Sequence, residues 1–250
     1  MGASGSYAES VRIGTSGWHY KHWVGTFYPE RMRPVNMLAY YQTYFDSVEL
    51  NNSFYQLPER PALELWRDST PSNFRFAVKG SRFLTHMKKL KDASVGLTRF
   101  LDAVEVLGEK LGPILFQLPP NWEIDLARLD SFLALVPAYH RYAFEFRNST
   151  WEQPATYELL ARHNIAHCAF DLAGYQSPIR LTADFAYVRL HGPGGKYQGS
   201  YSHEALTVWA DRIRAWLNEL TSVYIFFDND DSGFAARDAL RLKQLITNQD

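Results

Sequence analysis

Eight short runs of β-branched and aromatic residues recur along this chain of 250 residues, and helical patterns separate most of them. The runs are apolar almost throughout, which is typical of strands covered on both faces of a parallel sheet. The expected strands are residues 11–15, 47–50, 75–78, 113–117, 142–146, 165–170, 186–190 and 222–227. Because strands and helices alternate within a length common for one α/β domain, the sequence predicts a single (β/α)8 barrel of the TIM type.

Helices are expected where apolar residues recur on one face between these strands. In residues 93–110, Leu97, Leu101 and Val104 share a face, and Gly112 follows as a stop signal. The other helices are expected at residues 36–44, 61–68, 127–135, 150–163, 204–220 and 232–247. Between the sixth and seventh strands, residues 172–185 show no helical pattern, so an irregular or missing helix is expected there. A doubly wound open sheet is the alternative fold, but the turn after the first strand lacks the third glycine of a dinucleotide fingerprint.

The barrel domain is expected to span residues 11–250, after a flexible N-terminus of small and polar residues at 1–10. No run approaches the ~18 apolar residues that cross a bilayer, and the first residues lack the apolar segment of a signal peptide. We therefore expect a cytoplasmic protein with no membrane partner. The single cysteine, Cys168, excludes an intrachain disulfide and a cysteine-based metal cluster.

Ionisable residues inside or directly after the apolar strands are the main functional signal. In α/β barrels the chemistry lies at the C-terminal ends of the strands, and a charge within an apolar strand is costly unless it is paired or used. The candidate acid/base residues at these positions are Glu49, Glu145, His191 and Asp228. The candidate ligand-binding residues are Trp18, Tyr20, Asn51, Tyr55, Lys79, Gln117, Arg147, Arg189 and Asn229.

Two pairs of these residues are spaced two apart, which places both members on the same face of a strand. Glu145 and Arg147 are either an oriented catalytic carboxylate with its partner or a structural salt bridge. Arg189 and His191 are either ligand-binding and acid/base groups or a histidine hydrogen-bonded under a loop. Arg and Lys inside apolar strands, together with the glycine-rich residues 192–195, favour an anionic ligand.

Seven motifs follow one another along nearly the whole chain in an order that resembles one family. They are IGTSGWHYKHWVGTFYP at 13–29, VELNNSFYQLP at 48–58, FAVKGSRFLTH at 76–86, LGPILFQLPP at 111–120, FEFRNSTW at 144–151, YVRLHG at 187–192 and FFDNDDSGFAARDAL at 226–240. The sequence resembles the YecE-like proteins, domain of unknown function family 72. This resemblance implies a TIM-type barrel and supplies no established reaction. The chain departs from the family's pattern at Asn148, which removes a candidate histidine proton shuttle, and at Asp228, which adds a carboxylate where asparagine is usual.

We expect an enzyme that uses acid/base chemistry on a small anionic ligand, phosphorylated or polyhydroxylated, at the C-terminal ends of the strands. Hydrolysis, isomerisation and lyase chemistry all stay open. One alternative is a nucleic-acid-binding protein or metal-dependent nuclease with a basic third loop at residues 79–91, and another is a non-catalytic scaffold. The formal net charge of −1 argues only against nucleic-acid binding by the whole surface.

No cofactor is predicted, although a divalent metal stays an alternative. Carboxylates with an imidazole suit Mg, Mn or Zn, and the candidates are Glu49, Glu145, Asp171, His191 and Asp228. No local ligand spacing such as HExxH supports such a site. The sequence leaves the oligomeric state open.

Overall fold

The computed structural model describes residues 10–247. Its strands are β1 (Val11–Thr15), β2 (Ser47–Leu50), β3 (Arg75–Lys79), β4 (Leu111–Leu118), β5 (Tyr142–Phe146), β6 (Ala166–Leu172), β7 (Tyr175–Gln176), β8 (Phe185–Leu190) and β9 (Ser222–Phe227). Its α-helices are α2 (Met37–Tyr41), α3 (Asn52–Tyr55), α4 (Arg60–Ser69), α5 (Ser94–Val104), α6 (Leu126–Leu133), α7 (Pro154–Arg162), α8 (His203–Trp216) and α9 (Phe234–Thr247). The flexible N-terminus predicted at 1–10 lies, except for Ser10, outside the described residues.

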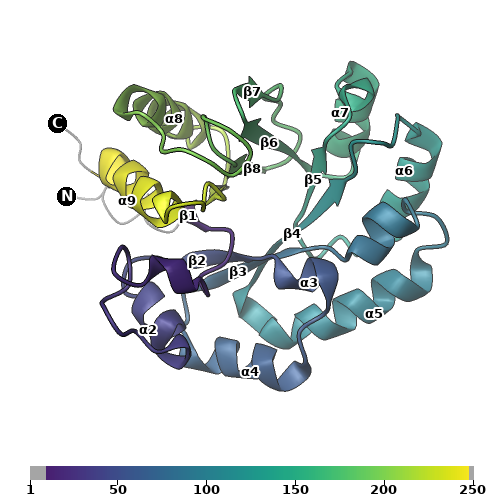
Figure 1. Ribbon diagram of the computed structural model, residues 1–250. Helices are drawn as coiled ribbons and strands as arrows, with labels where there is room; N and C mark the ends of the chain where they lie inside the picture. The colour runs from purple at the N-terminus through teal and green to yellow at the C-terminus, as the bar shows by residue number, and fades with distance from the viewer. Residues whose placement is uncertain (1–9, 248–250) are drawn as a thin grey trace. The chain divides into compact units, whose positions relative to one another are not determined.

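The chain divides into two compact units, of which unit 1 holds the described residues of 1–49, 169–177 and 184–250. Within it, β1 pairs in parallel with β9, and β9 pairs in parallel with β8. A parallel bridge between Ser16 and Glu49 joins the end of β1 to β2. The two strands approach closely because Gly14 has no side chain: a Cβ there would lie 2.2 Å from the carbonyl oxygen of Ser47. Helices α8 and α9 pack side by side in this unit (Figure 1).

Unit 2 holds residues 50–168 and 178–183. Strands β3, β4 and β5 pair in parallel in the order of the sequence, and β5 pairs with the first residues of β6. The register places Gln117 on β4 opposite Glu145 on β5, so these polar side chains belong to the same end of adjacent strands. Helices α4, α5, α6 and α7 connect the strands of this unit (Figure 1).

The strand topology confirms the predicted fold class, an α/β fold of the (β/α)8, TIM-barrel type. The hydrogen-bonded order is β1-β9-β8-β6-β5-β4-β3-β2, and the bridge between Ser16 and Glu49 links the last strand of this order to the first. A doubly wound open sheet has no such link, so that alternative is excluded. The two-residue strand β7, which was not predicted, pairs with β6 in the antiparallel direction. Residues 172–185 contain no helix, as expected.

Several expected helices are shorter in the structure, and two of them are shorter for a local reason. The helix expected at 93–110 ends at Val104, and a 3-10 segment, η4 (Glu105–Lys110), follows in which Gly108 has a φ of 58°. The helix expected at 150–163 begins only at Pro154, after a 3-10 turn η5 (Ser149–Trp151). Proline suits the first turn of a helix because its φ is fixed and its nitrogen has no hydrogen to leave unpaired.

Candidate functional site

A buried carboxylate and guanidinium form the centre of the site in unit 1. Glu49 on β2 and Arg189 on β8 have relative exposures of 0% and 1%. Arg189 Nη2 donates to Glu49 Oε1 at 2.8 Å, and Arg189 Nε donates to Oε2 at 3.0 Å, which is a bidentate geometry. Ser16 Oγ and Tyr187 OH each donate to Glu49 at 2.7 Å. Donors therefore surround both oxygens of this carboxylate, the arrangement that lets a charged group stay buried.

His191 joins this pair to a second carboxylate. Its Nδ1 lies 2.9 Å from Asp228 Oδ2, and its Nε2 lies 3.2 Å from Arg189 Nη1. A guanidinium can only donate, so Nε2 must accept and the ring proton must sit on Nδ1, from which it is donated to Asp228. These two contacts match the tautomer of the imidazole that carries its proton on Nδ1. We call Glu49, Arg189, His191 and Asp228, with the donors Ser16 and Tyr187, the Arg189 cluster.

Asp228 is the charged member of the Arg189 cluster that solvent reaches. Its side chain is 16% exposed, whereas the side chains of Glu49 and His191 are fully buried. Arg189 Nη2 donates to Asp228 Oδ2 at 3.3 Å, so one guanidinium is shared between two carboxylates. Glu49 is held by several donors, whereas the side chain of Asp228 is the carboxylate of the cluster that solvent reaches. The cluster therefore presents a carboxylate that can accept a proton or a hydrogen bond.

The loop after β1 places a phenol among the carboxylates of unit 1. Tyr20 OH donates to the carbonyl oxygen of Ser16. Burial first, and then the nearby Asp228, Asp230 and Glu49, raise the pKa of this phenol, because each of them disfavours a phenolate. Tyr20 is thus a neutral hydrogen-bonding group near the carboxylates of the cluster.

Asp230, two residues after Asp228, is a carboxyl group with an unusual environment. Trp23 Nε1 donates to its Oδ1, and His22 Nε2 lies 3.2 Å from its Oδ2. Burial raises the pKa of Asp230 to about 6, and Asp228 adds to the rise, while Trp23 and His22 oppose it. Near neutral pH this group can therefore hold or release a proton.

Asp171, at the end of β6, lies next to His191. The His191 backbone nitrogen donates to the Asp171 carbonyl oxygen at 2.8 Å. The side-chain Oδ1 of Asp171 is buried and has no hydrogen-bond partner among the described residues. Burial raises the pKa of Asp171, and His191 opposes this rise. An acid without donors beside it favours its protonated form.

The loop that follows β8 covers His191 with an aromatic ring. The ring centroids of Tyr197 and His191 lie 5.6 Å apart. Gly192 has a φ of 112°, and a Cβ there would lie 2.4 Å from the Gln198 carbonyl oxygen, so the loop needs glycine at this turn. Lys196, which is exposed, has its Nζ 5.2 Å from the Tyr197 ring centroid. The loop therefore holds a cation and an aromatic ring close to His191.

A buried aspartate on α9 anchors the end of this loop. Asp238 accepts hydrogen bonds from Ser200 Oγ at 2.7 Å, from the Tyr201 backbone nitrogen at 2.9 Å and from Asn229 Nδ2 at 2.8 Å. Asn229 Nδ2 also donates to the Gly199 carbonyl oxygen at 2.9 Å. The amide nitrogen of Asn229, a predicted ligand-binding residue, is thus occupied in holding the loop.

In unit 2 the predicted pair of Glu145 and Arg147 is formed. Arg147 Nε donates to Glu145 Oε1, and the glutamate side chain is fully buried. The Cys168 sulfur lies 3.8 Å from Glu145 Oε2. Gln117 lies opposite Glu145 in the strand register. The spacing argument for Glu145 and Arg147 is therefore confirmed as a contact, while their role stays a prediction.

The predicted residue Lys79 lies on an aromatic ring in unit 2. Its Nζ is 4.4 Å from the Phe54 ring centroid, and the Phe54 ring meets His86 edge-on at 5.0 Å. Tyr55 is 79% exposed, and its ring packs edge-on against Phe54 at 5.0 Å. Asn51 precedes α3, and its Oδ1 is buried without a hydrogen-bond partner among the described residues.

The sequence-predicted residues that the structure brings into one contact network are Glu49, Arg189, His191 and Asp228, and Tyr20 lies near them. Trp18 is buried and its carbonyl oxygen accepts a hydrogen bond from Tyr28, which gives its backbone a structural role. Tyr187 was missed, although its spacing of two from Arg189 and four from His191 on the same strand was a usable signal. Asp171 was considered only as a metal ligand.

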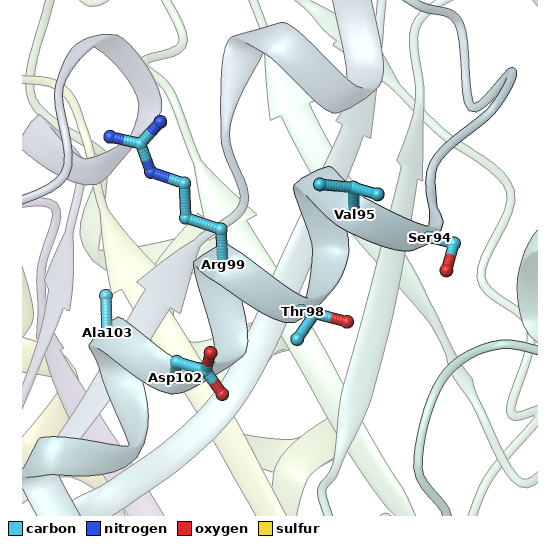
Figure 2. A pocket seen from close by; sticks show the side chains of 6 residues that line it. All are labelled: Ser94, Val95, Thr98, Arg99, Asp102 and Ala103. Atoms are coloured by element: carbon cyan, nitrogen blue, oxygen red, sulfur yellow. The ribbon is translucent and has the colours of Figure 1, made fainter.

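A hollow of about 580 Å³ lies on α5 in unit 2. It is lined by Ser94, Val95, Thr98, Arg99, Asp102 and Ala103 (Figure 2). All of these residues belong to one helix, and none is a candidate site residue.

Within residues 10–247, no three His, Cys, Asp or Glu side chains are grouped so that they could hold a metal ion. None of the helices described is long and apolar enough to cross a membrane.

Comparison with known proteins finds relatives of this chain. The family model described as "Protein of unknown function DUF72" matches residues 12–250. The chain is 25% identical to UPF0759 protein YunF of Bacillus subtilis, with 94% of each chain covered. It is 24% identical to UPF0759 protein YecE of Escherichia coli K12, covering 88% of this chain and 87% of that protein.

Solved structures support the same fold. A DUF72 family protein of Thermotoga maritima is 30% identical, with a TM-score of 0.88 over 96% of this chain and 100% of that chain. A DUF72 family protein of Enterococcus faecalis has a TM-score of 0.81 at 19% identity, over 96% of each chain, and shows the fold alone.

Proposed function

This chain belongs to the DUF72 family, and we propose that the Arg189 cluster is the active site of an enzyme that acts by acid/base chemistry on a small anionic ligand bearing hydroxyl groups. The observation that carries the proposal is the chain of contacts from Glu49 through Arg189 and His191 to Asp228. Buried ion pairs add little to the stability of a core, because replacing them by apolar residues is often neutral or stabilising. A purely structural role therefore does not explain these charged residues well. Buried ionisable groups at the C-terminal ends of barrel strands are typical of active sites.

Asp228 is the general base in this proposal. It accepts hydrogen bonds from His191 Nδ1 at 2.9 Å and from Arg189 at 3.3 Å, and both donors favour its ionised form. It is also the carboxylate of the cluster whose side chain is partly exposed, so a substrate hydroxyl can approach it. His191 and Arg189, which are buried, orient Asp228 and act as positioning residues.

Asp171 is the general acid. Its buried oxygen has no donor to stabilise a negative charge, and burial raises its pKa. The surroundings of Asp228 thus favour its ionised form, whereas those of Asp171 favour its protonated form. Enzymes that need both a base and an acid at one pH commonly use such a pair.

The ligand class follows from the groups at the rim of the cluster. Carboxylates and the Tyr20 phenol accept or exchange hydrogen bonds with hydroxyl groups, and the Tyr197 ring offers a face for a sugar-like ring. Lys196, next to Tyr197 on the loop after β8, supplies a cation for an anionic substituent. The roles proposed for Glu145, Arg147, Lys79, Gln117, Asn51 and Tyr55, and the cytoplasmic location, stay predictions.

The test is turnover of a panel of sugar phosphates, sugar acids and polyols, followed by NMR detection of any product. We expect the wild-type chain to convert at least one member, and Asp228→Asn to lower the rate by about 10²–10⁴-fold because asparagine cannot take up the proton. The matched control is Asp211→Asn on α8, an exposed aspartate whose change should leave the rate unaltered. Absence of turnover across the panel, or a wild-type rate in Asp228→Asn, contradicts the proposal.

The pH profile separates the two carboxyl groups. The rate requires Asp171 protonated, so it should fall as the pH rises through the raised pKa of that group. Asp171→Asn removes this alkaline fall together with most of the rate, whereas the acid side of the profile belongs to Asp228. A profile of Asp171→Asn that matches the wild type would remove Asp171 from the mechanism.

A further inference from the structure

We propose that unit 2 carries a phosphate-binding site formed by Lys79, Arg82 and His86 around the ring of Phe54. The inference does not rest on the proposed function, because none of these residues belongs to the Arg189 cluster. The ligand class is a phosphate group, either of a small phosphate ester or of a nucleic-acid strand.

The end of β3 and the helix α3 hold the site together. Ser53 Oγ donates to the Lys79 carbonyl oxygen at 2.6 Å, which fixes the backbone beneath the lysine. The Lys79 ammonium lies 4.4 Å from the Phe54 ring centroid, a cation–π geometry. The ring therefore serves as a platform that orients the ammonium group.

His86 approaches the same ring from the turn η3 (Phe83–Met87) that follows β3. Its ring meets Phe54 edge-on, with an interplanar angle of 85°. Its Nδ1 lies 2.9 Å from Thr85 Oγ1, which leaves Nε2 as the ring nitrogen available to a ligand. Arg82, directly before this turn, is exposed. A lysine, an arginine and a titratable histidine thus lie within eight residues of one another, at the end of β3 and in the turn that follows it.

Two cations act on the His86 ring. Burial first, and then Lys79 and Arg82, lower the pKa of His86 to about 4. A positive charge near an imidazole disfavours its protonated form, and an anion bound beside the ring has the opposite effect.

Phosphate matches this set of donors in number and charge. Its oxygens accept hydrogen bonds from an ammonium group, a guanidinium group and an imidazole N–H at the same time. A bound dianion also favours the imidazolium form of His86, so binding and protonation must be coupled. A carboxylate ligand has fewer oxygens and half the charge, which makes it the poorer match.

The exposed aromatic residues around the site bear on the source of the phosphate. Tyr55 and Phe83 are 79% and 43% exposed. Such rings can stack on the bases of a nucleic-acid strand, whereas a small phosphate ester does not need them. Removing the Tyr55 ring therefore discriminates between the two sources.

The experiment is an NMR titration of the His86 ring nitrogens in the full chain, without and with inorganic phosphate. We expect phosphate to raise the pKa of His86 by at least about one unit, since an adjacent opposite charge typically shifts a pKa by one to three units. Arg82→Ala and Lys79→Met should each weaken phosphate binding about tenfold or more, the usual loss for a charge-assisted hydrogen bond. Lys91→Ala, an exposed lysine of the same loop, is the matched control and should change the affinity less than about twofold.

Two results would overturn the inference: a His86 titration that phosphate does not move, or a loss of affinity in Lys91→Ala equal to that in Arg82→Ala. Because Arg82 is exposed, its alanine variant is expected to fold even if the Lys79 variant does not. A single-stranded oligonucleotide in place of phosphate identifies the source. Tyr55→Ala should weaken oligonucleotide binding about tenfold if bases stack there, and should leave it unaltered if the site takes small phosphate esters.

Discussion

Replacing Arg189 with methionine is expected to lower the free energy of unfolding by about 3–5 kcal/mol, because it leaves Glu49 buried without its charged partner. Methionine replaces the aliphatic part of the arginine side chain and lacks the guanidinium group, so the change removes the charge and the donors that Glu49 uses. Ser16 and Tyr187 still donate to Glu49, but neither carries a charge. The measurement is urea denaturation of the variant and the wild type.

Two comparisons make this result specific to the buried pair. Glu49→Gln in the Arg189→Met background should recover at least about 1–2 kcal/mol, because a neutral amide no longer needs a cation. Arg60→Met, which breaks the exposed pair of Arg60 with Glu64, should cost under about 1 kcal/mol. If Arg189→Met costs no more than Arg60→Met, the Arg189 cluster is not the buried network described above.

Replacing Asp238 with alanine is expected to be comparably destabilising, by about 3–5 kcal/mol, because it removes a buried charged acceptor from several donors. Ser200 Oγ, the Tyr201 backbone nitrogen and Asn229 Nδ2 would each lose the hydrogen bond to Asp238. The loop that carries Tyr197 over His191 should also open more often. Denaturation measures the first effect, and hydrogen exchange at the Tyr201 amide measures the second.

Asp238→Asn and Asp211→Ala are the matched variants for this prediction. Asparagine keeps the shape and one acceptor oxygen, so its cost should be smaller, about 1–3 kcal/mol. Asp211 lies on α8 with its side chain 67% exposed, and its change should cost under about 1 kcal/mol. An unaltered exchange rate at Tyr201 in Asp238→Ala would show that this aspartate does not anchor the loop.

The strands could be predicted because each is a run of apolar residues with an abrupt polar end. The same contrast made Glu49, Arg189 and His191 visible, since charged and imidazole groups rarely interrupt such runs. The contact between Glu145 and Arg147 could be predicted for a geometric reason, the two-residue repeat of a strand. These signals are local, and a single sequence carries them in full.

Partner identity could not be predicted, because it depends on which strands become neighbours. Arg189 was expected to bind an anionic ligand, whereas in the structure its donors face Glu49 and Asp228. Asp238 was not singled out in the sequence, and packing of α9 buries it fully. The turn η3 around His86 was missed because a single π-type turn has no periodic sequence pattern.

The ring-nitrogen spectrum of His191 at neutral pH shows which nitrogen carries the proton. We expect Nε2 to accept from Arg189 and Nδ1–H to donate to Asp228, which keeps Asp228 ready to act as a base. Long-range proton–nitrogen NMR distinguishes the protonated ring nitrogen from the unprotonated one. The expected spectrum has a proton on Nδ1 and a lone pair on Nε2. A proton on Nε2, or on both nitrogens, would show that His191 does not position Asp228 in this way.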